Sequence, residues 1–191
     1  MDAQLLYFSL CFIALVLAFN LFLTFALAKR LDAAGLLVPQ VKKTSLVDTK
    51  IAAFSASKFS DRATLTLPAA NIPTVWLFLS SQCPKCRQTL PDLDAILLPC
   101  QRAGVHLQLL SLEPRKQIAS FLGNSTLTEH CFVLKRKPYL ALNPTRLSPA
   151  YLFINHLGFV EAEGMIGDEN WLSFCQQLSE DSADTLAESP L

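Results

Sequence analysis

The sequence predicts an α/β domain, a mixed β-sheet flanked by helices, preceded by one N-terminal transmembrane helix. Three observations lead to this prediction. Residues 5–28 contain no charge, proline or glycine, and residues 74–79 form the continuous apolar run of a strand buried on both faces. Residues 87–103 then place leucine and isoleucine at helical spacing before strand character resumes at 105–112. Strand, helix and strand in succession indicate a parallel pair.

The apolar segment at 5–28 is long enough to cross a bilayer, which takes about 20 apolar residues in a helix. The alternative is a cleaved signal peptide, since residues 26–28 (Ala-Leu-Ala) resemble a cleavage site. The segment is long for a signal peptide and no basic residue precedes it, so a retained anchor within 1–30 is predicted. Lys29 and Arg30 follow the segment, and the positive-inside rule alone would then keep the domain in the cytoplasm.

The rest of the 191-residue chain has room for one domain with its own core. Residues 31–70 show no long helical period and predict a juxtamembrane spacer with one or two short edge strands. The compact domain is predicted at 71–178. The tail at 179–191 is acidic, contains serine and lacks aromatic residues, and it is predicted to be disordered.

Within the domain, a second helix is predicted at 113–123, opened by Glu-Pro and ended by glycine. The sequence from 130 to 147 is ambiguous and holds a candidate short strand at 131–134. Two β-rich runs within 150–162 are separated by turn residues and predict a hairpin. A closing helix is predicted at 171–178.

Charge composition narrows the choice of partner. The 16 basic and 16 acidic residues cancel, and neither sign gathers into a long run. Nucleic-acid binding depends on such clusters, so no nucleic-acid partner is predicted.

One close-spaced cysteine pair has a clear chemical meaning. Cys83-Pro84-Lys85-Cys86 lies where a predicted strand passes into a predicted helix. Unpaired backbone N–H groups and the helix dipole stabilise a thiolate at that position, so Cys83 is the candidate nucleophile. Cys86 lies one turn on and can resolve a mixed disulfide by attacking Cys83. Lys85 adds positive charge that favours the thiolate.

A Cys-x-x-Cys can also be half of a zinc site, which needs two further ligands. None of the other candidates forms a second close-spaced pair, so redox use is favoured and neither metal nor cofactor is predicted. A Cys100–Cys131 disulfide remains an open alternative in an oxidising compartment. The candidate zinc ligands are Cys100, Cys131, Cys175, His106, His130 and His156.

Ser148-Pro149 directly precedes the predicted strand at 150–154. A proline there can simply start a strand. With the upstream Cys-x-x-Cys, it matches the position where thioredoxin-like folds place a cis-proline beside the active disulfide. On the runs VWLFLSSQCPKCRQTLPDLDAIL, which includes Pro91, and LSPAYLFINHLGFVEAEGMIG, the chain resembles the thioredoxin superfamily and, more narrowly, its membrane-anchored TlpA/MauD branch.

The resemblance implies a thioredoxin-like fold in which Cys83 attacks, Cys86 resolves, and Ser148 with Pro149 forms a backbone platform for a substrate segment. It also implies a protein substrate with cysteine thiols or disulfides and a separate redox partner protein. MauD-type proteins face the periplasm from the inner membrane. They are associated with disulfide formation or isomerisation in the methylamine dehydrogenase light subunit.

One departure from the family pattern bears on the direction of the reaction. Many thioredoxins carry a buried acid six residues before the first cysteine, and this chain has Leu77 there. That favours oxidation or isomerisation over reduction. Two alternatives stay open: a TlpA- or ResA-like reductant for cytochrome c or copper-protein assembly, and a non-catalytic membrane-anchored assembly factor.

Overall fold

The computed structural model describes residues 12–24, 26, 45–69 and 71–187. The chain divides into two units, 1–44 and 45–191. In the first unit, residues 12–24 are α-helical. Across the described ranges, no helix combines the length and apolar character needed to cross a membrane. The transmembrane prediction at 5–28 extends over residues outside the described ranges.

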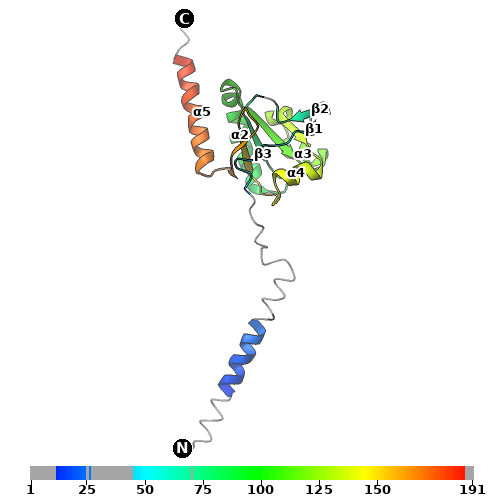
Figure 1. The fold of residues 1–191 in the computed structure, drawn as a ribbon, viewed down its shortest axis with the longest axis vertical. Coiled ribbons are helices and arrows are strands. Elements are labelled where there is room, and N and C mark those ends of the chain that lie inside the picture. Colours follow the sequence, from blue (N-terminus) through cyan, green and yellow to red (C-terminus); the bar gives the residue numbers. More distant parts are fainter. Residues whose placement is uncertain (1–11, 25, 27–44, 70, 188–191) are drawn as a thin grey trace, which may run out of the picture. The chain divides into compact units, whose positions relative to one another are not determined.

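The second unit is built on one seven-stranded mixed sheet, in the order β2-β1-β5-β4-β3-β6-β7. Figure 1 labels three of these strands, β1, β2 and β3. The central strand β3 is parallel to β4 and antiparallel to β6, which confirms the predicted parallel pair and the mixed sheet. The strands are β1 (Phe54–Lys58), β2 (Thr64–Leu67), β3 (Thr74–Phe78), β4 (His106–Ser111), β5 (Cys131–Val133), β6 (Ala150–Ile154) and β7 (Val160–Met165).

Helices cover both faces of this sheet. All five residues of β3 are buried, and successive residues of a strand point to opposite faces. Val75 and Leu77 pack in the core layer shared with α2, α3 and α5, whereas Trp76 and Phe78 pack in the layer shared with α4. The helices are α2 (Pro84–Arg102), α3 (Arg115–Leu122), α4 (Arg136–Leu142), α5 (Glu169–Ala187) and the 3-10 helix η1 (Thr126–His130).

The first two strands belong to the domain rather than to a spacer. β1 pairs with β2 and with β5, so it lies inside the sheet, and β2 forms the edge. The sequence predicts 31–70 as a spacer with one or two short edge strands, and the structure has two short strands there, of which only β2 is at the edge. Sheet pairing with a distant strand is what orders these short segments.

The region at 130–147, ambiguous in sequence, contains β5 and α4. β5 is parallel to β4, and α4 accommodates Pro138 in its first turn. The backbone N–H groups of a first turn have no partner within the helix, so proline costs little there.

Helix α5 corrects the prediction of a disordered tail from residue 179. It extends to Ala187, and residues 188–191 lie outside the described part of the chain. The segment 179–187 contains neither glycine nor proline, so nothing in it stops a helix that is already nucleated by its packed first half. The Gln176 side chain also donates to Glu180 at 2.9 Å, one turn further on.

Arg115, in α3, forms hydrogen bonds to residues at the end of β1. Its Nη2 donates to Ser57 Oγ at 2.8 Å and to the Lys58 carbonyl at 3.0 Å, and its Nη1 donates to the Phe59 carbonyl. The guanidinium carbon also lies 5.5 Å from the centre of the Phe59 ring. One side chain therefore satisfies two carbonyls and a hydroxyl of the first hairpin.

We predict that Arg115→Met lowers the free energy of unfolding by about 1–3 kcal/mol, because it removes three hydrogen bonds and keeps only the apolar stem. The Lys58 carbonyl would retain one partner, the Arg62 backbone N–H at 3.2 Å. Urea unfolding of both proteins measures the difference. Lys116→Met is the matched control, since Lys116 is exposed on the same helix, and it should change stability by less than about 0.5 kcal/mol. Equal effects of the two substitutions would contradict this role for Arg115.

Candidate active site

The site forms where β3 passes into α2. The buried strand fixes the chain up to Phe78, and a short turn then leads to Cys83, which is the N-cap of α2. Cys83 has extended backbone angles (φ −89°, ψ 114°), as N-cap residues do. Pro84 begins the helix, where its missing N–H removes no helical hydrogen bond.

Cys83 is half-buried, and its sulfur takes the place of the oxygen of a usual N-cap side chain. Cys83 Sγ accepts a hydrogen bond from the Cys86 backbone N–H at 3.3 Å, and it lies 3.6 Å from the Ser148 carbonyl oxygen. Burial raises the pKa of the Cys83 thiol, and hydrogen bonds from the Cys86 side chain and backbone lower it. With smaller contributions from Ser148 and the Lys85 backbone, the net pKa of Cys83 is lowered.

Cys86 differs sharply from Cys83. Its side chain is fully buried against the core, and its sulfur accepts a hydrogen bond from the Ser80 backbone N–H at 3.5 Å. Burial raises the pKa of Cys86 to about 11, although the bond from Ser80 opposes that change. The sequence predicts both cysteines at the start of one helix, but burial is what separates the two thiols in acidity.

Ser148 and Pro149 lie beside this pair. The Ser148–Pro149 peptide bond is cis, and the Ser148 carbonyl faces Cys83 Sγ. The Asn143 side chain orders the approach to the bond, since it donates to the Leu147 carbonyl at 2.8 Å and accepts from the Leu147 N–H at 2.9 Å. The structure thus brings together two segments that are 65 residues apart.

Two sequence predictions concern single side chains near the pair. Lys85 is exposed, and its backbone contributes to lowering the pKa of Cys83; the effect predicted for its charge stays a prediction. Leu77 is fully buried in the apolar layer beneath α2, so β3 supplies no carboxylate there.

Glu113 is a residue near the pair that sequence reasoning missed as a part of the site. It lies between β4 and α3, and its carboxylate accepts hydrogen bonds from Ser80 and Ser81 in the turn before Cys83. A signal was present in the sequence, because Glu113 directly follows the strand predicted to run parallel to β3. The carboxyl ends of adjacent parallel strands meet at one edge of a sheet, which places such a residue beside the cysteine motif.

The remaining described cysteines lie in the core. Cys100 and Cys131 are fully buried free thiols, so no bond joins them, and burial raises the pKa of each to about 12. Cys175, half-buried in α5, is also a free thiol. Within the described ranges, no group of three or more histidine, cysteine or acidic side chains could hold a metal ion.

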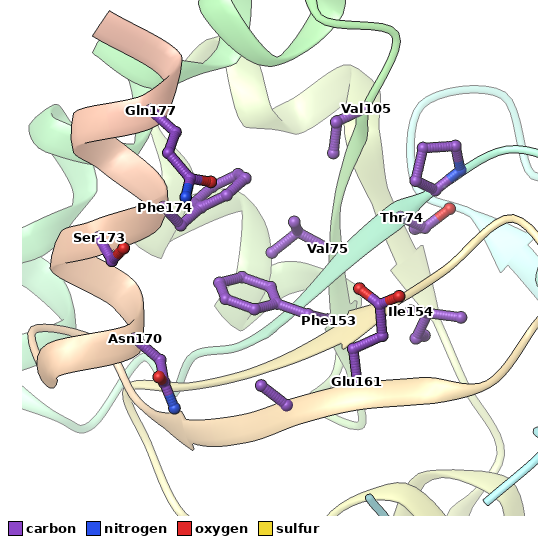
Figure 2. Close-up of a pocket in the computed structure, with 12 residues that line it drawn as sticks. Thr74, Val75, Val105, Phe153, Ile154, Glu161, Asn170, Ser173, Phe174 and Gln177 are labelled. Atoms are coloured by element: carbon purple, nitrogen blue, oxygen red, sulfur yellow. The ribbon is translucent and has the colours of Figure 1, made fainter. Parts of the chain in front are cut away.

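A separate cavity of about 340 Å³ lies near the start of β3, at the opposite end of that strand from the cysteines. Figure 2 shows Phe174 and Gln177 of α5 on one side of it and Val75 and Phe153 of the sheet on the other. No cysteine lines this cavity.

Solved structures with this architecture include several redox proteins. The thioredoxin domain of a thiol-disulfide oxidoreductase from Bacteroides vulgatus superposes with a TM-score of 0.60 at 13% identity, covering 71% of this chain and 99% of that one. A secreted Mycobacterium tuberculosis disulfide oxidoreductase gives 0.53 at 16% identity, covering 66% and 95%. The chain therefore has a thioredoxin-like fold. StoA from Bacillus subtilis shares it, with a TM-score of 0.52 at 18% identity, covering 63% and 90%.

The superpositions confirm the predicted fold, including a mixed sheet with helices on both faces. No protein-family model matches the chain, and no curated protein matches it. This fold places Cys83 and Cys86 beside the Ser148–Pro149 bond, with the pKa of Cys83 lowered and that of Cys86 raised.

We predict that Cys83 is alkylated before Cys86 when the reduced protein meets limiting iodoacetamide. The rate at Cys83 should rise with pH through a midpoint below 9.0, the ordinary thiol value, because the lowered pKa yields thiolate at lower pH. Peptide mass spectrometry across a pH series measures this, with half-buried Cys175 as the internal control whose pKa burial raises. A Cys83 midpoint above 9.0 would show that the hydrogen bonds do not stabilise its thiolate.

Proposed function

We propose that this protein is a thiol-disulfide oxidoreductase in which Cys83 is the attacking thiol and Cys86 the resolving thiol. The observation that carries the proposal is the contrast between two thiols on one helical turn. Cys83 is accessible with a lowered pKa, and Cys86 is fully buried with a pKa of about 11. Such a pair supplies one thiolate for attack and keeps the other protonated until it is needed.

The exchange proceeds in two balanced steps. The Cys83 thiolate attacks one sulfur of a substrate disulfide, the substrate S–S bond breaks, and one substrate sulfur leaves as a thiolate. Cys86 then loses its proton to solvent and attacks Cys83 Sγ, which releases the second substrate thiolate and forms the Cys83–Cys86 disulfide. Two electrons pass from the pair to the substrate, and the same steps in reverse oxidise a substrate dithiol.

We propose oxidation or isomerisation of substrate disulfides as the physiological direction. Hydrogen bonds to the Cys83 sulfur stabilise the reduced pair, which makes the disulfide a stronger oxidant. Leu77 leaves β3 without a carboxylate to accept the Cys86 proton, which disfavours efficient release of a substrate by Cys86.

The substrate in this proposal is a protein with cysteine thiols or disulfides. In this proposal Ser148 and Pro149 lie along an extended substrate segment, which is supported by the Ser148 carbonyl oxygen 3.6 Å from Cys83 Sγ. Pro84 and Lys85 are exposed and flank the same sulfur. A separate redox partner protein would restore the pair after each turnover.

The cellular setting we propose is a single-pass anchor in the inner membrane with the domain in the periplasm. The uncharged segment at 5–28 and the resemblance to the TlpA/MauD branch support it. In that setting the enzyme would act in maturation of a periplasmic enzyme such as the methylamine dehydrogenase light subunit.

The equilibrium reduction potential of the Cys83–Cys86 couple tests the direction. Titration of the full chain against glutathione, with thiol trapping and mass spectrometry, should give about −120 to −180 mV, as for oxidants and isomerases. A value near about −270 mV or below would instead identify a TlpA- or ResA-like reductant of cytochrome c or copper-protein thiols.

The same titration tests whether the pair is catalytic at all. Cys83→Ser should abolish disulfide exchange, while Cys175→Ser should leave it intact because Cys175 lies in α5, away from the motif. Retained function after loss of both motif cysteines would identify a non-catalytic assembly factor.

A further inference from the structure

The carboxylate of Glu113 accepts hydrogen bonds from two residues of the turn before Cys83, Ser80 and Ser81. Glu113 Oε1 accepts from Ser80 Oγ at 2.9 Å and from Ser81 N at 3.0 Å, and Oε2 lies 3.2 Å from Ser81 N. Its own backbone N–H is held by Ser111 Oγ at 3.1 Å. The half-buried side chain thus spans from the end of β4 to the end of β3 with both oxygens in use.

Ser80 is the residue through which this carboxylate reaches the cysteines. The Ser80 carbonyl accepts from Cys83 N at 3.1 Å, and the Ser80 N–H donates to Cys86 Sγ at 3.5 Å. Its hydroxyl oxygen also accepts from Gln82 N at 3.3 Å. A group that fixes Ser80 therefore fixes a hydrogen-bond donor that points at the buried sulfur.

We propose that Glu113 is a positioning residue for the resolving thiol: it holds Ser80 so that the Ser80 N–H stays directed at Cys86 Sγ. This inference rests on the proposed thiol-disulfide exchange. In its second step, Cys86 becomes a thiolate inside an apolar layer, attacks Cys83 Sγ and breaks the bond from Cys83 to the substrate sulfur. A fixed N–H lowers the cost of that buried charge.

The acidity of Cys86 agrees with this geometry. Among the influences on the Cys86 pKa, burial is the largest, and the hydrogen bond from the Ser80 backbone is the first that lowers the pKa. Cys83 is stabilised mainly by the Cys86 side chain and backbone instead. Loss of Glu113 should therefore act on the second step of exchange and leave the first step largely unchanged.

A two-phase reaction separates the steps. When the reduced full chain meets excess 5,5′-dithiobis(2-nitrobenzoate), Cys83 attack releases one nitrothiobenzoate. Cys86 attack on the resulting mixed disulfide releases the second and leaves the Cys83–Cys86 disulfide. Stopped-flow absorbance resolves the two releases, and a Cys83→Ser/Cys86→Ser protein gives the background from the other thiols.

We predict that Glu113→Gln slows the second phase about tenfold and changes the first phase by less than about twofold. Glu113→Asp, which keeps the charge, should recover part of the rate. Glu161→Gln is the matched control, because Glu161 is an exposed carboxylate on β7 away from the pair, and it should change neither phase. Ser80→Ala should slow the second phase, and its effect should not add to that of Glu113→Gln.

The outcomes distinguish the two proposals. A wild-type protein without a second phase would overturn the oxidoreductase proposal itself. A normal wild-type reaction with an unchanged second phase in Glu113→Gln would overturn only the role of Glu113. Equal slowing of both phases would show a general loss of structure. A faster second phase would show that the carboxylate repels the Cys86 thiolate. Either result would contradict the proposal that Glu113 positions Ser80.

Discussion

The hydrogen bond from the Cys86 N–H to Cys83 Sγ, 3.3 Å long, is the contact on which the site depends. It caps α2, and it stabilises negative charge on the sulfur that faces solvent. The capping atom is here an ionisable sulfur and not the usual side-chain oxygen. The bond that caps the helix therefore also lowers the pKa of the Cys83 thiol. One hydrogen bond therefore both caps the helix and stabilises the thiolate.

The sheet and its two core layers determine where this helix begins. β3 is buried on both faces and ends at Phe78, and α2 packs with Leu90, Leu93 and Leu97 on the layer beneath. Cys86 lies on that packed face, whereas Cys83 lies just outside the helix. The packing of α2 thus buries the Cys86 thiol in the core and leaves the Cys83 thiol near the surface. The difference in pKa between the two thiols follows from this difference in burial.

Much of this arrangement is predictable from sequence, for identifiable reasons. Three of its features are local sequence patterns: the apolar run of β3, the helical spacing of α2 and the Cys-x-x-Cys between them. They can therefore be predicted without knowledge of the tertiary structure. Pro149 is found through resemblance to a superfamily, because no local pattern connects the Ser148–Pro149 pair to Cys83, which lies 65 positions before Ser148.

Other features depend on contacts between distant segments. Strand β1 pairs with β5, which is distant in the sequence, and β2 pairs with β1; the short sequences of the two strands do not predict these partners. Glu113 is recognisable only when β3 and β4 are known to be neighbours, since its partners Ser80 and Ser81 belong to another segment. The length of α5 depends on its packed first half, and local composition alone suggested disorder for the remainder.

The most direct test of the central claim is to stop the exchange after its first step. A Cys86→Ser protein, reduced and then exposed to glutathione disulfide, should keep one glutathione on Cys83, because no second thiol remains to release it. The wild-type protein under the same conditions should lose the adduct and form the Cys83–Cys86 disulfide. A stable adduct on another cysteine, or wild-type protein that retains glutathione on Cys83, would contradict the division of roles between the two thiols.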